Sequence, residues 1–332
     1  MNIKDSVGTA FARACQDRLS SSIGKGISKH ELRQEAISSG SERHSSGLLH
    51  ADTTIDNYAG IATRYAEWMK ETHPDCTRLK IAHKRKYDHE YIQSLIDRGL
   101  SPSTIKTYTA ALSFLHNCTM NDIHSERPIV QPKDATRCRY YSEQVYQEQL
   151  SKCEKNQNEN LVAILRLCRI TGLRKDEARQ IRPENFIWTK NGVVCHLTGA
   201  NKAHHMHQNE SNVHTKGGRE RTIEVLPRYE AELMDILSHT EAHTPICSHI
   251  PNDINIHGIR ALYAAEMYQA FARPIADIPV HERTMENGKN LPSRYIDKAG
   301  HTWDRRALLR VSASLGHSRS NVVVHNYLWM LN

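Results

Sequence analysis

The sequence lacks an apolar run long enough to cross a membrane. Its apolar stretches, such as residues 161–165 and 322–324, fall far short of the about 20 residues that a spanning helix needs. The N-terminal residues also lack the apolar core and the small-residue cleavage site of a secretion signal. We therefore expect a protein that has no membrane partner and works in the cytoplasm.

Cysteine pairs at short spacing are also absent. Scattered thiols without a CxxC pair are typical of reduced cysteines rather than of a disulfide framework or a zinc knuckle. The eight cysteines are Cys15, Cys76, Cys118, Cys138, Cys153, Cys168, Cys195 and Cys247. We therefore expect no structural metal.

The length and the charge balance narrow the protein class. A chain of 332 residues is long enough for about two domains, which excludes a single small module. Lys and Arg number 44 against 37 Asp and Glu, a formal charge of +7. This excess points weakly to a polyanionic partner, because basic side chains release counterions when they neutralise phosphates.

Residues 1–47 predict a small helical appendage followed by a flexible linker. Residues 10–19 fit one short amphipathic helix, and a second begins near Ser28, which has Glu31 at the capping-box position. Residues 38–47 are rich in Ser and Gly, a composition that favours a flexible connection.

Residues 48–125 predict a compact, all-helical domain. From Thr53 to Met69 the apolar residues recur at three- and four-residue steps, the period of a helix with one buried face. A second helix begins at Ser101 and Pro102, a cap followed by proline in the first turn.

Basic and hydroxyl side chains of this domain are suited to phosphate contact. Lys, Arg, Ser and Thr side chains supply many of the contacts that proteins make to DNA phosphates. The candidate DNA-binding residues are Lys84, Arg85, Lys86, Ser103, Thr104 and Lys106. An ordinary solvated face is an equally good interpretation of these residues taken alone.

Residues 126–139 contain two prolines and no hydrophobic period, which predicts a linker, and a second domain follows at 140–332. This domain opens with helices that end at Gly172, continues with strands at 193–197 and 221–226, and returns to helices after Ile256. The predicted fold class is mainly α with a small antiparallel sheet.

Five short segments of the second domain place reactive side chains at boundaries between elements. They are TGLRKDE from Thr171, HTKGGRERTIEVL from His214, HGIR from His257, LGHS from Leu315 and VVVHNYL from Val322. Their candidate catalytic residues are Arg174, Lys216, His257, Arg260, His317 and Tyr327. These residue types are the ones that a metal-free attack on a phosphodiester requires.

The expected chemistry begins with the phenol of Tyr327. A phenol is a poor nucleophile at neutral pH unless a neighbour accepts its proton, and we assign this role to His257. The pentacoordinate phosphate then carries extra negative charge, which guanidinium forks and a histidine N–H can bind. Arg174, Arg260 and His317 are the residues that we expect to do so.

Lys216 is the predicted general acid for the departing 5′ oxygen. It precedes Gly217 and Gly218, which form a turn before a predicted strand, and a lysine at a hairpin tip can reach a leaving group. Lys202 also lies between the predicted strands and remains the alternative.

The ordered series Arg, Lys, HxxR, LGH and Tyr resembles the tyrosine recombinase, or phage-type integrase, family. The resemblance covers residues 140–328 and includes the phrases ITGLRKDEARQIRPENF and LGHS. It implies a DNA clamp, in which a helical core-binding domain at 48–125 is joined by a linker to the catalytic domain. Glu177 is then expected to support the arginine region rather than to react.

The resemblance also implies a reaction and its partners. The tyrosine attacks one DNA strand, forms a 3′-phosphotyrosyl link and frees a 5′ hydroxyl, and a partner strand then attacks that link. Because the ester keeps the energy of the broken bond, neither a metal nor another cofactor is expected. Expected partners are double-stranded DNA attachment sites, a homotetramer in the synaptic complex and accessory DNA-bending proteins, acting in the nucleoid to integrate or excise a mobile element.

Two spacings depart from the family pattern. Arg260 and His317 are 317 − 260 = 57 positions apart, which indicates an insertion at about 272–301 whose role the sequence does not reveal. Tyr327 follows His317 by 10 positions, one more than the usual spacing, yet it is the only tyrosine after Tyr295.

Three further interpretations stay open. His204, His205 and His207 are metal ligands by residue type, but no cysteine or acid stands at ligand spacing, which favours a solvated or DNA-facing loop. A type IB topoisomerase would use a similar pocket without exchanging strands. A catalytically silent DNA-binding regulator would keep the fold, but it would be free to lose any of the six catalytic side chains.

Overall fold

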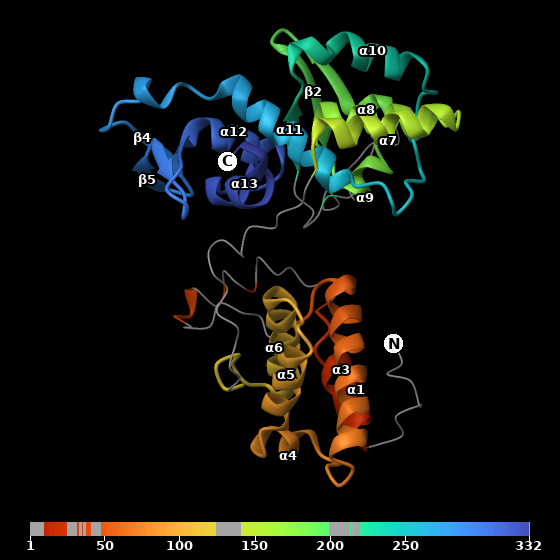
Figure 1. Cartoon of the computed structure of the whole chain (residues 1–332), viewed down its shortest axis with the longest axis vertical. Coiled ribbons are helices and arrows are strands. Elements are labelled where there is room, and N and C mark those ends of the chain that lie inside the picture. Colours follow the sequence, from red (N-terminus) through yellow and green to blue (C-terminus); the bar gives the residue numbers. More distant parts are fainter. Residues whose placement is uncertain are drawn as a thin grey trace. The chain divides into compact units, whose positions relative to one another are not determined.

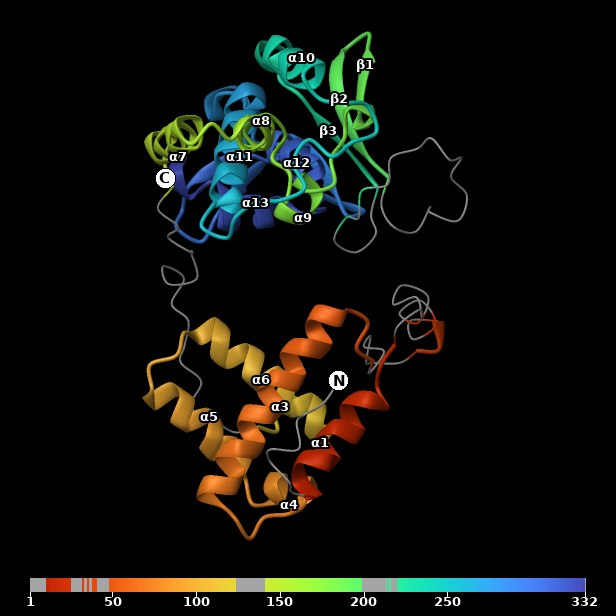
Figure 2. The same cartoon turned by 90° about the vertical axis from the view of Figure 1, so that its right-hand side faces the viewer.

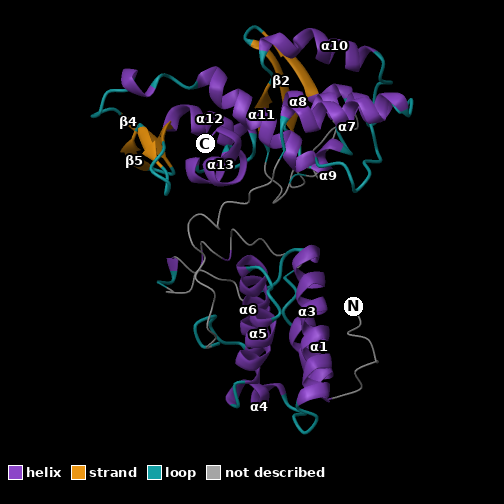
Figure 3. Cartoon of the chain, viewed as in Figure 1, coloured by secondary structure: helices purple, strands orange, loops and turns teal. Residues whose placement is uncertain are grey.

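In the computed structural model of the chain, the described residues are 10–24, 32, 35, 38–40, 48–123, 141–198, 213, 215 and 220–331. The chain divides into two compact units, Met1–Val130 and Gln131–Asn332 (Figure 1). Among the described residues, the named elements of the first unit are all helices, whereas the named strands all belong to the second unit (Figure 3). Among the described residues, no helix is long and apolar enough to cross a membrane.

Helices build the first unit around one apolar core. The two helices predicted from periodicity and capping are confirmed, and the Ser101 hydroxyl accepts a hydrogen bond from the Thr104 backbone N–H at the start of the second. The described helices are α1 (Ala10–Ser20), α3 (Asp52–Thr72), α4 (Leu79–Lys84), α5 (Tyr87–Asp97) and α6 (Pro102–His116).

Helix α1 is not the separate appendage that the sequence predicts. Its residues Phe11, Cys15 and Leu19 are buried in the same core as α3 and α6, and the Phe11 ring meets the Tyr65 ring edge-on with centroids 5.5 Å apart. The apolar face of a short helix does not reveal its partner, which is why the sequence alone misplaced it. Of the linker predicted at 38–47, residues 41–47 lie outside the described residues, as does nearly all of the helix expected from Ser28.

Helices and a small sheet form the second unit (Figure 2). Its helices are α7 (Glu143–Lys155), α8 (Glu159–Thr171), α9 (Lys175–Ala178), α10 (Glu230–Ser238), α11 (Ile256–Phe271), α12 (Arg305–Ser314) and α13 (Ser320–Tyr327). Its main sheet has the order β1 (Phe186–Thr189), β2 (Gly192–Leu197) and β3 (Arg221–Glu224). All of its pairs are antiparallel, as predicted, whereas β1 was not foreseen.

Gly172 is the point at which the chain leaves α8 for the candidate site. Its φ of 62° is the left-handed conformation that ends a helix, and a Cβ atom there would lie 2.2 Å from the Tyr263 ring. Glycine is therefore required twice, for the turn and for the close approach of α11. This turn places Arg174 at the N-cap of α9.

The segment interpreted as an insertion folds into two hairpins. Strand β4 (Arg283–Glu286) pairs with β5 (Lys289–Pro292), and β6 (Arg294–Ile296) pairs with β7 (Thr302–Asp304). Arg273 fastens the segment by hydrogen bonds to Asp304 and Glu282. The β4–β5 turn consists of Asn287 and Gly288, both at positive φ, an Asn-Gly hairpin signal that the sequence analysis overlooked.

Candidate active site

Five of the six candidate catalytic residues line one cleft of about 760 Å³ in the second unit. Arg174 comes from the start of α9, His257 and Arg260 from α11, His317 from the turn after α12, and Tyr327 from the last position of α13. Residues that lie up to 153 positions apart (327 − 174) therefore converge on one cleft. The sixth, Lys216, lies outside the described residues, as do Lys202 and His204, His205 and His207.

The Tyr327 hydroxyl lies between an arginine and a histidine. It accepts a hydrogen bond from Arg260 Nε at 3.3 Å and lies 3.2 Å from His317 Nε2. The His257 ring packs against the Tyr327 ring with centroids 5.3 Å apart. His317, which we expected to bind phosphate, thus has a ring nitrogen at hydrogen-bond distance from the expected nucleophile.

Arg260 is held in one orientation by backbone oxygens. It is buried, its Nη1 donates to the Gly172 carbonyl, and its Nη2 donates to the Leu315 carbonyl at 2.5 Å. Burial lowers the pKa of Arg260 to about 10, so the guanidinium remains charged at neutral pH. A fixed positive charge therefore lies beside the Tyr327 hydroxyl.

Glu177, which we expect to support the arginine region, contacts Arg174 directly. Its carboxylate accepts hydrogen bonds from the Arg174 backbone N–H at 2.8 Å and from Arg174 Nη1 at 2.9 Å. Arg174 Nη2 donates in turn to the Leu315 carbonyl. Glu177 is buried, and this raises its pKa, but hydrogen bonds and charge from Arg221 and Arg174 outweigh burial and lower the pKa to about 2.

Arg221 is a site residue that the sequence analysis missed. Its Nη1 and Nη2 atoms donate to the two Glu177 oxygens at 2.8 and 2.5 Å, so Glu177 is clamped between two arginines. Arg221 is the first residue of β3 and occupies a buried position in the alternating burial pattern of this strand. A charged residue at a buried position of RTIEVL could have indicated from the sequence that Arg221 has a buried partner of opposite charge. At Gly316, a Cβ would lie 2.9 Å from Arg221 Nη1, so this turn also requires glycine.

The candidate DNA-binding residues do not form one patch. The His83 ring stacks on the His116 ring with centroids 4.9 Å apart, which places the end of α4, and hence Lys84, beside the last turn of α6. Ser103 is in the first turn of α6, about 20 Å away along a helix that rises 1.5 Å per residue. Lys84–Lys86 and Ser103–Lys106 are therefore separate surfaces at opposite ends of α6.

One group in the described part of the first unit has the residue types of a metal site. The ligand atoms of His83, Asp88 and His116 lie within 4.8 Å of one another. His83 Nδ1 is already 2.8 Å from Asp88 Oδ2, and the two histidine rings stack at an interplanar angle of 28°. Because imidazole lone pairs lie in the ring plane, stacked rings do not direct both nitrogens at one ion. We interpret the group as a His–Asp pair covered by a second imidazole.

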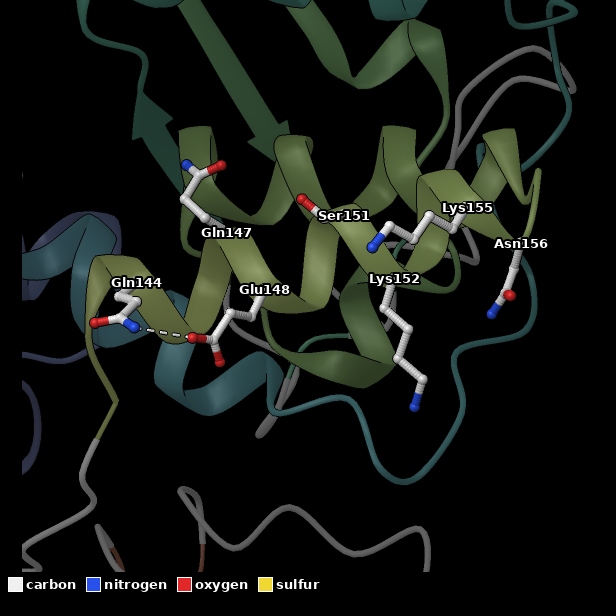
Figure 4. A pocket seen from close by; sticks show the side chains of 7 residues that line it. All are labelled: Gln144, Gln147, Glu148, Ser151, Lys152, Lys155 and Asn156. Carbon is white, nitrogen blue, oxygen red and sulfur yellow. Dashed lines mark hydrogen bonds between the residues drawn. The ribbon is translucent and has the colours of Figure 1, made fainter.

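A second hollow, of about 480 Å³, follows one side of α7 (Figure 4). The side chains around it come from this helix and the residue after it, and Gln144 donates to Glu148 along the same helix. The cleft at Tyr327 differs because it gathers cationic side chains from several elements. It is therefore our candidate active site.

One comparison with known proteins concerns the sequence of the second unit. Residues 133–243 match a family model described as "Integrase". A search of curated proteins by sequence gave no match.

Among solved structures, the chain is similar to the XerH site-specific recombinase bound to a palindromic difH substrate. The two chains are 13% identical, the alignment covers 96% of this chain and 90% of XerH, and the TM-score is 0.50. This chain also matches the integrase of the Tn1549 transposon in complex with circular-intermediate DNA, with 11% identity over 91% and 95% of the two chains and a TM-score of 0.42. Residues 133–243 therefore match an integrase family model, and the chain shares its fold with the XerH site-specific recombinase.

Proposed function

We propose that this chain is a site-specific recombinase that cleaves and rejoins DNA through a 3′-phosphotyrosyl link to Tyr327, and that it integrates or excises a mobile element. The observation that carries the proposal is the environment of the Tyr327 hydroxyl, which Arg260 and His317 both contact in a cleft that Arg174 also lines. The side chains that we propose as nucleophile, proton acceptor and phosphate-binding cations thus lie around one cleft.

In the cleavage step, the Tyr327 oxygen bonds to phosphorus as the bond from phosphorus to the 5′ oxygen breaks. The phenol proton passes to a histidine. His257 is the base proposed from the sequence, and the hydrogen-bond distance between His317 Nε2 and the hydroxyl makes His317 a second candidate. The 5′ oxygen takes a proton from Lys216, the proposed general acid.

Positive side chains stabilise the phosphorane. Arg174 and Arg260 bind its equatorial oxygens, and because their guanidinium groups are held by protein acceptors before DNA arrives, little reorganisation accompanies the reaction. Rejoining reverses these steps with the 5′ hydroxyl of a partner strand. The ester conserves the energy of the phosphodiester, so we propose that neither a metal nor ATP is needed.

The proposed partners are double-stranded DNA attachment sites, a homotetramer that holds two such sites, and accessory DNA-bending proteins in the nucleoid. The XerH recombinase, whose fold this chain shares, is bound to its difH substrate, which supports a DNA partner for this chain. The two basic surfaces at the ends of α6 are candidate contacts to the phosphate backbone.

A covalent-trapping experiment tests the proposal. Wild-type protein is incubated with nicked duplexes of random sequence, and DNA that stays attached after denaturation is recovered and sequenced, which also yields the target site. Wild type and Tyr295→Phe should form the adduct, whereas Tyr327→Phe should form none, because it loses the attacking oxygen but no positive charge. An adduct with Tyr327→Phe, or none with wild type, would refute the proposal.

A second measurement separates recombination from topoisomerase activity. Two duplexes that carry the recovered site and different end labels are mixed with wild-type protein. A recombinase joins strands between the two labels, whereas a type IB topoisomerase relaxes supercoiled DNA and reseals each strand to its own partner. Relaxation of a supercoiled plasmid that carries the site, without exchange of strands between the labelled duplexes, would favour the topoisomerase.

A further inference from the structure

Helix α13, which carries Tyr327 at its end, is too short to hold its own position. It has eight residues, and helices of this length are not stable in water without tertiary contacts. The first turn of any helix also leaves backbone N–H groups without helical partners. The N-cap residue of α13, Arg319, provides no side-chain hydrogen bond to them.

A carboxylate from the inserted hairpins performs this capping. Glu286, the last residue of β4, accepts hydrogen bonds from the Ser320 backbone N–H at 2.9 Å and from the Ser320 hydroxyl at 2.8 Å. The two residues are 34 positions apart in the chain and both are buried. A negative charge at a helix N-terminus is also favoured by the helix dipole.

Arg305 balances the charge of Glu286 and links it to α12. Its Nη1 donates to Glu286 Oε2 at 2.5 Å and to the Ser320 hydroxyl at 3.1 Å, and its Nε donates to the Pro292 carbonyl of β5 at 2.6 Å. Burial raises the pKa of Glu286, but the hydrogen bonds from Ser320 and Arg305 outweigh this and lower it. The carboxylate is therefore charged, forms an ion pair with Arg305, and accepts hydrogen bonds at both of its oxygens.

We propose that Glu286 is a positioning residue for the nucleophile, and that the segment at 272–304 exists in this chain to hold α13. Tyr327 lies seven residues after Ser320, about 10 Å along the helix axis, so a tilt at the capped end displaces the phenol. The Asn287–Gly288 turn fixes where Glu286 stands. This inference rests on the proposed function, because it assigns a support to the proposed nucleophile.

The test measures the rate constant and the final extent of adduct formation separately. A nicked duplex that carries the site recovered with wild type makes attachment irreversible, so the extent reports the fraction of folded enzyme and the rate constant reports how well Tyr327 is placed. Glu286→Gln should reach the wild-type extent with a rate constant reduced about tenfold or more, since a misplacement of about 1 Å can cost about 10²-fold. DNA binding should be unchanged.

Asp277→Asn is the matched control. Asp277 belongs to the same segment and is exposed, so this variant removes one charge from the segment without loosening its attachment through Arg273, and it should keep the wild-type rate constant. Glu286→Asp decides the matter if Glu286→Gln does not fold, because it keeps a charge beside Arg305 but ends one methylene short of Ser320. It should show the same loss of rate.

A rate constant reduced less than tenfold in the folded Glu286 variant, or an equal loss in Asp277→Asn, would overturn the inference while leaving the proposed function intact. A DNA substrate with sulfur as the leaving 5′ atom gives a further check. A sulfur leaving group makes the general acid unnecessary, but the reaction still requires a correctly positioned nucleophile. This substrate should therefore not restore the rate constant of Glu286→Gln. Restoration would also overturn the inference. Absence of an adduct with wild type would instead refute the proposed function.

Discussion

The guanidinium groups of Arg174 and Arg260 donate to the same backbone oxygen, the Leu315 carbonyl, at 2.9 and 2.5 Å. Leu315 precedes Gly316 and His317, so this one carbonyl joins the turn that carries the histidine to both arginines. A displacement of either arginine would therefore displace the other phosphate-binding groups.

Arg221→Gln should lower both stability and the rate of adduct formation. The substitution leaves the buried Glu177 carboxylate with Arg174 alone, and breaking a buried ion pair costs about 3–5 kcal/mol of the free energy of unfolding. Arg310→Gln is the control, because its pair with Glu224 is exposed and contributes about 0–1 kcal/mol. Urea unfolding measures both. Equal, small losses would show that Arg221 does not support the site.

Stability should fall in acid partly through Glu177. Its pKa is about 2 in the folded chain against an ordinary 4.5, so its contribution is complete above pH 4.5 and disappears as the pH falls from 4.5 towards 2. At about 1.4 kcal/mol per pKa unit, the contribution is about 3 kcal/mol. The difference in free energy of unfolding between wild type and Glu177→Gln should shrink over this window. A difference that does not change with pH would contradict the assigned pKa.

Chelation should not affect cleavage. In the proposed mechanism Arg174, Arg260 and a histidine stabilise the phosphorane, so a metal ion has no step to perform. The rate of adduct formation is measured with and without EDTA. If EDTA abolishes activity and added Mg²⁺ or Zn²⁺ restores it, the proposed mechanism is wrong. His204, His205 and His207 would then be candidate metal ligands.

Lys216→Ala should slow cleavage of normal DNA by roughly 10²–10⁴-fold, the usual range for a positioned proton donor. DNA binding should change little. A substrate with sulfur in place of the leaving 5′ oxygen needs almost no protonation, so the variant should recover most of its rate on it.

Lys202→Ala is the control for this prediction and should behave as wild type on both substrates. Recovery by sulfur in Lys202→Ala, but not in Lys216→Ala, would identify Lys202 as the acid. If both variants are slow and sulfur restores neither, the loop positions DNA instead of donating a proton.

Local signals in the sequence were sufficient to predict helices α3 and α6 and to select five candidate site residues. Capping at Ser101 with Pro102 and the apolar period of α3 depend on neighbours three or four residues away, so they can be read directly. Arg174, His257, Arg260, His317 and Tyr327 stand in short phrases whose order is itself informative, and the structure gathers them around one cleft.

Only the tertiary structure decided which residues hold the site in place. Arg221 binds Glu177, which lies 44 positions away in the sequence, and Glu286 binds Ser320, which lies 34 positions away. Contacts at such sequence separations produce no periodic pattern that a sequence could show. The same reason explains why the sequence predicts α1 as an appendage and does not show that Lys84 and Ser103 lie at opposite ends of α6. A sequence shows which faces are apolar and which side chains are charged, whereas packing of separate elements determines which of them meet.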